Sequence, residues 1–287
     1  MATQPDRKII NQATVMNPSS DLYRIESGAG APLLLIHGTG FSADVWASLV
    51  QPLSLHRRVI AYDRRGFGRS TAKKPSLPMA FADHAKDAHE LLAAVAPGEP
   101  AVVIGWSSGG IVALHLAATY PESVRALVLI EPSLRARQHR DARILLGMTR
   151  VFWNILLKRS RPAAVAFFRT VTRYRDGSGS GFDALPRHQR EALLDDSAAV
   201  LAEMRNGTGE ELSNEQLNRV RCPVALLLGT RSAAMFAALG RDLARVIPQL
   251  HTIRIEQSGH IPMVEAPEAL LDAIVSTLVT TPAAPGE

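Results

Sequence analysis

Short apolar runs alternate with longer amphipathic stretches over most of the chain. The runs are rich in Val, Ile and Leu and are as short as buried strands; they lie at 32–36, 57–62, 101–104, 124–130 and 223–228. The stretches between them space their apolar residues for a helix, as at 81–96. Two further short strands are expected within 13–27 and another at 251–255. Strands that alternate with helices, and that are apolar throughout, predict an α/β protein with a parallel sheet covered on both faces.

This alternation stops after Pro132. Residues 133–219 show helical patterns and loops but no clear strand, with helices expected over 141–158, 162–174 and 186–205. The first of these is apolar on more than one face, so we expect it to be buried on both sides or to cover a cavity. We therefore expect one core built from 1–132 and 220–287, with 133–219 inserted after the strand that ends at Glu131.

The composition is that of a globular protein. Of 287 residues, 46% are hydrophobic and 21% are charged, and the single cysteine, Cys222, excludes an internal disulfide. The polar stretch 1–11 does not have the apolar run of a signal peptide, and no segment reaches the roughly 18 apolar residues of a membrane span. These features predict a cytoplasmic protein without stable membrane insertion.

The positive charge is concentrated in the inserted segment. The chain carries a net charge of +5, and residues 133–190 alone hold 13 Lys and Arg against three Asp and Glu. This charge is compatible with an anionic substrate or carrier, although a solvated surface is the more common origin of such an excess. No nucleic-acid-binding motif is present, so a nucleic-acid partner is not expected.

Candidate chemistry lies at Gly105-Trp-Ser107-Ser-Gly109, between an apolar run and a stretch of helix formers. A sharp strand-to-helix turn holds a serine clear of its own backbone, and small neighbours leave room for the strained turn. The following helix directs its N-terminal N–H groups toward that serine. The alternative, a glycine-rich turn with an incidental serine, is disfavoured by this strand-helix context.

This pentapeptide resembles the nucleophile elbow of the α/β-hydrolase family. The resemblance extends over nearly the whole chain outside 133–219, through His37-Gly38, the loop Asp63-Arg-Arg-Gly-Phe-Gly-Arg-Ser70, and Gly259-His260 followed by Glu265-Ala-Pro267. It implies a mostly parallel, doubly wound sheet of about eight strands with helices on both faces. It also implies that 133–219 is a helical cap over the active site.

The resemblance also assigns roles to residues. Ser107 corresponds to the nucleophile and His260 to the base. The backbone N–H groups of Thr39, with Gly40 as a nearby alternative, and of Ser108 correspond to the oxyanion hole. The same resemblance makes His37 and Asp63 structural.

The acid of the expected triad departs from the commonest pattern of the family. Many members carry an aspartate in a Gly-x-x-Asp motif, but this chain has Gly229-Thr-Arg-Ser232 at that place. Other members take the acid from the end of the preceding strand, which here is Glu131. A carboxylate that closes an apolar strand is costly to bury unpaired, and a hydrogen bond to His260 would compensate for that burial. A Ser–His dyad and an inactive site are the alternatives.

These residues predict a serine hydrolase that cleaves the carboxylic ester of a small to medium apolar substrate, without metal or organic cofactor. Thioesterase, lactonase, amidase, perhydrolase and lyase activities remain open, as does a biosynthetic acyltransferase or cyclase. Because the family's epoxide hydrolases and haloalkane dehalogenases need a carboxylate at the nucleophile position, Ser107 disfavours both. A non-catalytic binder of small molecules is the alternative from another class. The sequence does not define an oligomeric state.

Overall fold

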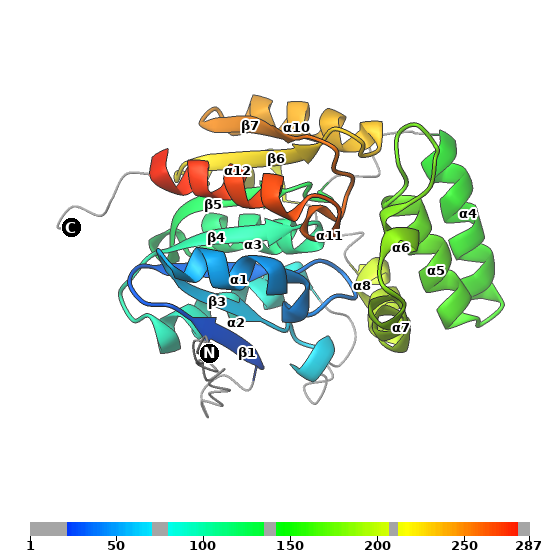
Figure 1. Ribbon diagram of the computed structural model, residues 1–287, viewed down its shortest axis with the longest axis horizontal. Helices are drawn as coiled ribbons and strands as arrows, with labels where there is room; N and C mark the ends of the chain where they lie inside the picture. Colours follow the sequence, from blue (N-terminus) through cyan, green and yellow to red (C-terminus); the bar gives the residue numbers. More distant parts are fainter. Residues whose placement is uncertain (1–21, 71–79, 135–141, 207–211, 281–287) are drawn as a thin grey trace, which may run out of the picture.

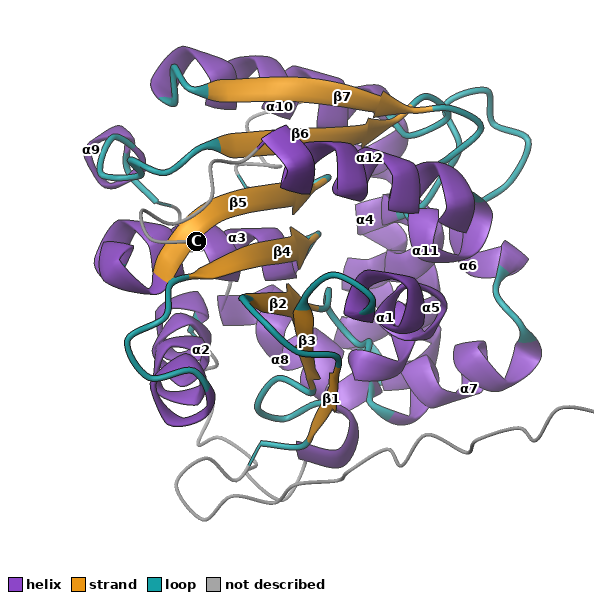
Figure 2. Cartoon of the chain, turned by 60° about the vertical axis from the view of Figure 1, so that its left-hand side comes forward, coloured by secondary structure: helices purple, strands orange, loops and turns teal. Residues whose placement is uncertain are grey.

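Seven strands form one sheet in the order β1-β3-β2-β4-β5-β6-β7 (Figure 2). The computed structural model describes residues 22–70, 80–134, 142–206 and 212–280. The strands are β1 (Arg24–Ser27), β2 (Pro32–Ile36), β3 (Arg58–Tyr62), β4 (Ala101–Trp106), β5 (Val124–Ile130), β6 (Val224–Gly229) and β7 (Leu250–Ile255). Only β1 among them pairs antiparallel, with β3. The predicted α/β class with a mostly parallel sheet is confirmed. The described strands number seven rather than about eight, and the first of the two strands expected within 13–27 lies outside the described residues.

Helices cover both faces of this sheet. Figure 1 shows α1 (Ala47–Ser54) and α12 (Pro267–Thr280) in front of it, and α2 (Phe81–Val95), α3 (Ser108–Thr119) and α10 (Ala234–Val246) behind. Successive strand side chains point to opposite faces, so Leu33 and Leu35 join one apolar cluster while Leu34 and Ile36 join the other. The continuous apolar runs of the sequence are therefore explained by burial on both faces.

Short elements complete the core. They are the 3₁₀ helices η1 (Ala43–Trp46), η2 (Gly68–Ser70) and η3 (Pro121–Ser123), and the one-turn helices α9 (Asn214–Leu217) and α11 (Pro262–Glu265). Ser42 begins η1, where its hydroxyl accepts a hydrogen bond from the Asp44 N–H.

The described residues of the segment between β5 and β6 are mainly helical. It contains α4 (Ala142–Leu156), α5 (Ser160–Val171), α6 (Gly181–Ala184), α7 (Arg187–Asp195) and α8 (Ser197–Asn206), and it lies beyond the carboxyl ends of the parallel strands (Figures 1 and 2). We call it the α4–α8 segment. Phe168 on α5 and Val200 on α8 belong to the same apolar cluster as Phe41 and Trp106 of the core. Apolar packing therefore joins the segment to the loops at that end of the sheet.

Two details of this segment differ from the sequence-based expectations. The helix expected over 186–205 is divided into α7 and α8 at Asp196, whose carboxylate accepts a hydrogen bond from the Gly68 N–H at 3.2 Å. Of the two expectations for the long first helix, burial on both sides is wrong, and covering a cavity stays a prediction. α4 packs on α5, buries Val151, and exposes large apolar side chains along one side.

Candidate active site

The turn at Ser107 joins β4 to α3 in a strained backbone conformation. Ser107 has φ 55° and ψ −120°, a region that non-glycine residues rarely adopt, and its N–H donates to Ile130 O at 2.9 Å. Both flanking glycines are required by close backbone approach. A Cβ on Gly109 would lie 2.3 Å from Ile36 O, and one on Gly105 would lie 2.4 Å from Gly109 O. The Gly-x-Ser-x-Gly pattern is therefore explained by packing at this turn.

His260 lies in the loop between β7 and α11, and both its backbone and its ring are held. Trp106 Nε1 donates to the His260 carbonyl at 2.7 Å. The imidazole stacks on the Phe236 ring, with centroids 4.4 Å apart. Glu265 Oε2 accepts the N–H groups on either side, from Gly259 at 2.9 Å and from Ile261 at 3.0 Å. These contacts fix the ring orientation at the end of the sheet that carries Ser107.

The three predicted catalytic side chains lie together, although they are far apart in the sequence. His260 Nε2 is 3.1 Å from Ser107 Oγ, and His260 Nδ1 is 2.7 Å from Glu131 Oε2. An ionised carboxylate only accepts hydrogen bonds, so Nδ1–H donates to Glu131 and the Nε2 lone pair faces the serine hydroxyl. In this arrangement His260 Nε2 can accept the proton of the Ser107 hydroxyl.

Glu131 reaches His260 because the backbone turns sharply at the end of β5. Its φ is 43°, a left-handed conformation in a residue without glycine's freedom, and its N–H donates to Leu227 O at 3.1 Å. The side chain is 1% exposed. Glu131 Oε1 accepts the Gly229 N–H at 2.8 Å while Oε2 receives His260. Gly229 begins the Gly-x-x-Asp position at which many family members carry the triad aspartate. In this chain it instead donates its backbone N–H to Glu131.

The loop predicted to hold the oxyanion packs directly against the serine. A Cβ on Gly38 would lie 3.1 Å from Ser107 Cβ. Thr39 is the next residue in the chain and therefore lies close to Ser107. Ser108 is the first residue of α3, where the free N–H groups of a helix carry partial positive charge. The side chains of Thr39 and Ser108 also meet, with their hydroxyl oxygens 2.9 Å apart.

A buried ion pair adjoins these two residues, and the sequence analysis missed it. Arg64 Nη1 lies 2.8 Å from Glu203 Oε2, and the two side chains are 0% and 2% exposed. Thr39 Oγ1 donates to Glu203 Oε1 at 2.5 Å, and Arg64 Nη2 donates to Ser108 Oγ at 3.0 Å. Glu203 belongs to α8, so its carboxylate ties the α4–α8 segment to both predicted oxyanion residues.

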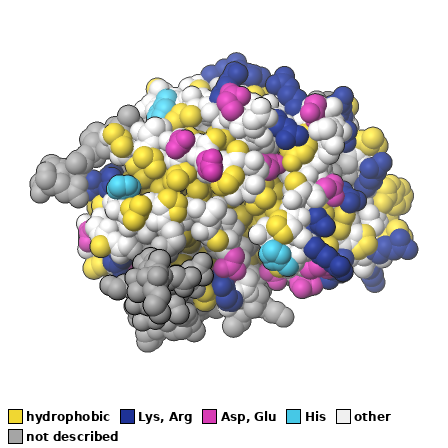
Figure 3. Space-filling model, in the orientation of Figure 1, with side chains coloured by type: hydrophobic (Ala, Val, Ile, Leu, Met, Phe, Trp, Pro, Cys, Tyr) yellow, Lys and Arg dark blue, Asp and Glu magenta, His cyan; other side chains and the backbone are white. Residues whose placement is uncertain are grey.

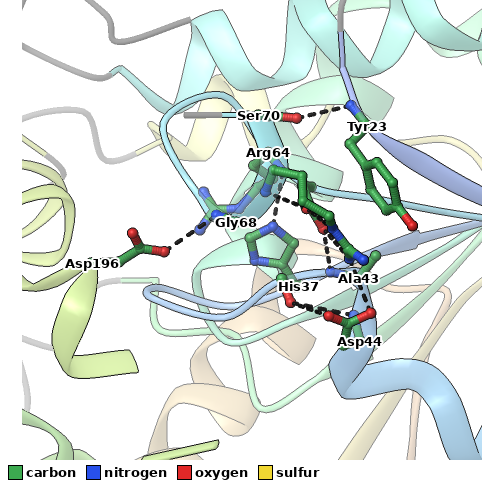
Figure 4. Close-up of polar contacts among 11 residues, drawn as sticks. Tyr23, His37, Ala43, Asp44, Arg64, Gly68, Ser70 and Asp196 are labelled. Carbon is green, nitrogen blue, oxygen red and sulfur yellow. Dashed lines mark hydrogen bonds and ion pairs between the residues drawn. The ribbon is translucent and has the colours of Figure 1, made fainter. Parts of the chain in front are cut away.

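His37 supports this cluster in its neutral form. Burial and the adjacent Arg64 charge lower the pKa of His37 to about 3. Its Nε2 accepts the Arg64 N–H at 2.8 Å (Figure 4). Its Nδ1 donates to Gly38 O at 2.8 Å. Asp63, in the same loop, accepts the N–H groups of Ala43 and Arg69, each at 2.7 Å. These contacts favour the structural roles expected for His37 and Asp63.

The buried ion pair makes stability depend on pH. Burial alone would raise the pKa of Glu203, but the Arg64 charge and the hydrogen bonds from Arg64, Thr39 and Ser108 bring that pKa below its ordinary value of 4.5. A carboxyl group with a lowered pKa stabilises the fold above its unfolded-state pKa, and this stabilisation is lost as pH falls through the folded-state pKa. We therefore expect the free energy of unfolding to fall more steeply below about pH 4.5 in the wild type than in Glu203→Gln. Urea titrations at several pH values test this, and parallel curves would contradict it.

The described part of the chain contains neither a metal-binding cluster nor a membrane-spanning helix. Within it, no group of three or more His, Cys, Asp or Glu side chains is placed to hold a metal ion. None of its helices is both long and apolar enough to cross a bilayer.

Comparisons with known proteins identify the family of the chain. The sequence profile of the alpha/beta hydrolase fold matches residues 31–267, and the chain belongs to that family. It is 30% identical over 262 residues to a pimeloyl-[acyl-carrier protein] methyl ester esterase of Chromobacterium violaceum, covering 88% of this chain and 96% of that protein. It is 28% identical over 268 residues to the protein of the same name from Vibrio atlanticus, covering 90% and 98%.

A solved structure shares the fold. The enol-lactonase of Burkholderia xenovorans superimposes with a TM-score of 0.72 at 21% identity, over 90% of this chain and 96% of that one. The predicted class is confirmed: the chain is an α/β hydrolase, and these two relatives, which it matches over nearly their whole length, are named as methyl ester esterases.

Proposed function

We propose that this protein hydrolyses carboxylic esters through an acyl-enzyme formed on Ser107. The observation that carries the proposal is the unbroken hydrogen-bond chain from Ser107 Oγ through the His260 ring to Glu131. Serine is a weak nucleophile unless a base takes its proton and a third group orients that base. The strained turn at Ser107 and the strained turn at Glu131 support the same assignment, because strain of this kind concentrates at functional sites.

The reaction proceeds in two halves. The Ser107 oxygen attacks the ester carbonyl carbon as its proton passes to His260 Nε2. The tetrahedral intermediate collapses when the alkoxide leaves with that proton as an alcohol. Water then attacks the acyl-serine ester, again losing a proton to His260, and the carboxylic acid leaves as Ser107 recovers its proton.

Backbone donors stabilise the charge that develops on the carbonyl oxygen. We assign this role to the N–H groups of Thr39 and Ser108, as the family resemblance implies. The start of α3 at Ser108 supports the assignment, because a helix N-terminus favours negative charge. Glu131 accepts the Nδ1–H of His260, which holds the tautomer of the ring and stabilises the imidazolium that forms.

The substrate we propose is a small alkyl ester of a medium-length apolar acyl group. The methyl ester esterases among the relatives support an ester with a small alcohol. The α4–α8 segment acts as a cap in this proposal, since Phe168 and Val200 pack with Phe41 beside the Ser107 loop. A cytoplasmic location and the helical cap over 133–219 remain predictions.

A panel of esters tests the function. We expect methyl and ethyl esters of medium-length fatty acids to be cleaved faster than bulky-alcohol esters, with Ser107→Ala protein as the blank. Adding a competing alcohol separates hydrolysis from acyl transfer by the products formed. Saturable ligand binding without any product from esters, thioesters or lactones would replace the enzyme with a small-molecule binder.

A further inference from the structure

The outer side of α4 carries a stripe of exposed large apolar side chains. Among the described residues, eight such side chains are mostly exposed, and six of them belong to this stripe. They are Leu145 (66%), Leu146 (62%), Phe152 (62%), Trp153 (59%), Leu156 (58%) and Leu157 (56%), which we call the α4 stripe. At about 100° per residue they occupy one sector roughly 140° wide. Such a patch, in contrast to scattered single residues, marks a binding surface.

α4 has its other side already occupied. It packs closely on α5, where a Cβ on Gly147 would lie 2.2 Å from Thr170 Oγ1. Val151, on the same helix, is buried. The α4 stripe therefore cannot turn inward without breaking this helix pair, and it stays at the edge of the molecule farthest from the sheet (Figure 1).

Positive charge surrounds the α4 stripe. Residues 142–175 contain eight Lys and Arg and no Asp or Glu. Arg150, Lys158 and Arg159 are exposed, and no carboxylate of the described residues forms an ion pair with them. In Figure 3, hydrophobic and basic side chains lie together along the right-hand edge, where α4 lies.

We propose that the α4 stripe is a docking surface for an anionic lipid bilayer. Leu, Phe and Trp on one helix face with Lys and Arg at its margins fit the boundary between acyl chains and negatively charged headgroups. A second copy of the chain would bring the exposed Arg150, Lys158 and Arg159 of one copy close to the same basic residues of the other. An acidic protein partner would match the charge but would not need six large apolar side chains in one stripe. The bilayer matches both properties.

The dimensions of α4 define the mode of binding. Its 15 residues span about 22 Å, less than the roughly 30 Å hydrocarbon core of a bilayer. α4 therefore lies in the plane of the membrane surface, as a peripheral contact. The parallel strands end on the side of the molecule where α4 lies (Figure 1), so docking turns the end that carries Ser107 toward the lipid.

Tryptophan fluorescence tests this proposal without depending on enzyme activity. The chain has three tryptophans; Trp46 and Trp106 are 0% and 1% exposed, so a change in emission on binding reports Trp153. We expect vesicles of phosphatidylcholine with phosphatidylglycerol to shift the emission to the blue, and vesicles of phosphatidylcholine alone to have little effect. Cosedimentation gives the partition coefficient.

Matched variants separate the stripe from general surface effects. The double variant Phe152→Ser, Leu156→Ser should weaken partitioning into the anionic vesicles at least about tenfold. The control Leu55→Ser changes a leucine that is 78% exposed outside the α4–α8 segment, and it should leave partitioning unchanged. Arg150→Ser and Lys158→Ser should each weaken binding to the anionic vesicles about fivefold. The proposal is overturned if the anionic vesicles neither bind nor shift Trp153, or if the stripe variant binds like wild type. It is also overturned if light scattering shows a dimer that the stripe variant loses.

Discussion

Glu131→Gln is expected to lower kcat by about 10²- to 10⁴-fold while leaving the free energy of unfolding nearly unchanged. The glutamine amide can keep both contacts of the carboxylate, with the direction of the hydrogen bond to His260 reversed. Its oxygen accepts the Gly229 N–H, and its NH₂ donates to His260 Nδ1. His260 must then carry its proton on Nε2, where it points at Ser107 and cannot accept the hydroxyl proton. The buried hydrogen bonds of residue 131 are kept, but His260 is in the tautomer that cannot act as a base toward Ser107.

This variant is measured with a chromogenic ester at saturating concentration, beside urea unfolding of the same preparation. Glu131→Asp is the matched control, because it keeps a carboxylate that can accept the His260 Nδ1–H. Its shorter side chain places that carboxylate farther from Nδ1. We expect its kcat to lie between those of Glu131→Gln and wild type. Turnover of Glu131→Gln at the wild-type rate would remove Glu131 from the mechanism.

The second large effect concerns the buried ion pair between the core and α8. Glu203→Ala should lower the free energy of unfolding by about 3–5 kcal/mol, because the Arg64 guanidinium is left buried without its carboxylate. Thr39 loses its acceptor in the same variant, so kcat should fall as well. Denaturant unfolding and ester turnover measure the two effects separately.

Two controls show whether an unpaired buried charge is the cause. Replacing both partners, Arg64→Met with Glu203→Leu, should recover most of the lost stability, since well-packed apolar pairs often replace buried ion pairs without loss. Glu191→Ala removes an exposed partner of Arg161 in the same segment, and should cost less than about 1 kcal/mol. Equal losses in Glu203→Ala and in the double variant would contradict the explanation.

The parts of the site that the sequence revealed are those with a local signature. Gly105, Ser107 and Gly109 stand together because one turn needs a strained serine between two glycines that the backbone approaches closely. Glu131 was identifiable because a carboxylate at the end of an apolar strand requires a partner, and His260 lies at hydrogen-bond distance. The parallel sheet was predictable in a similar way, because continuous apolar runs are typical of strands that helices cover on both faces.

The parts that the sequence did not reveal depend on contacts between distant segments. Glu203 and Arg64 are 139 residues apart, and each has ordinary neighbours, so no local pattern connects α8 with the loop after β3. Likewise, the break at Asp196 follows no proline or glycine; it coincides with a hydrogen bond to Gly68. The exposure of one side of α4 was not predictable, because hydrophobicity alone does not distinguish apolar side chains in a core from apolar side chains on the surface.

The central claim is that His260 activates Ser107 as a nucleophile. Its most direct test is the intact mass of the protein after reaction with a fluorophosphonate, followed by peptide mapping. The account predicts one adduct per chain, located on Ser107, absent from Ser107→Ala and formed far more slowly in His260→Ala. Folded wild-type protein that forms no adduct, or an adduct that persists in Ser107→Ala, would contradict it.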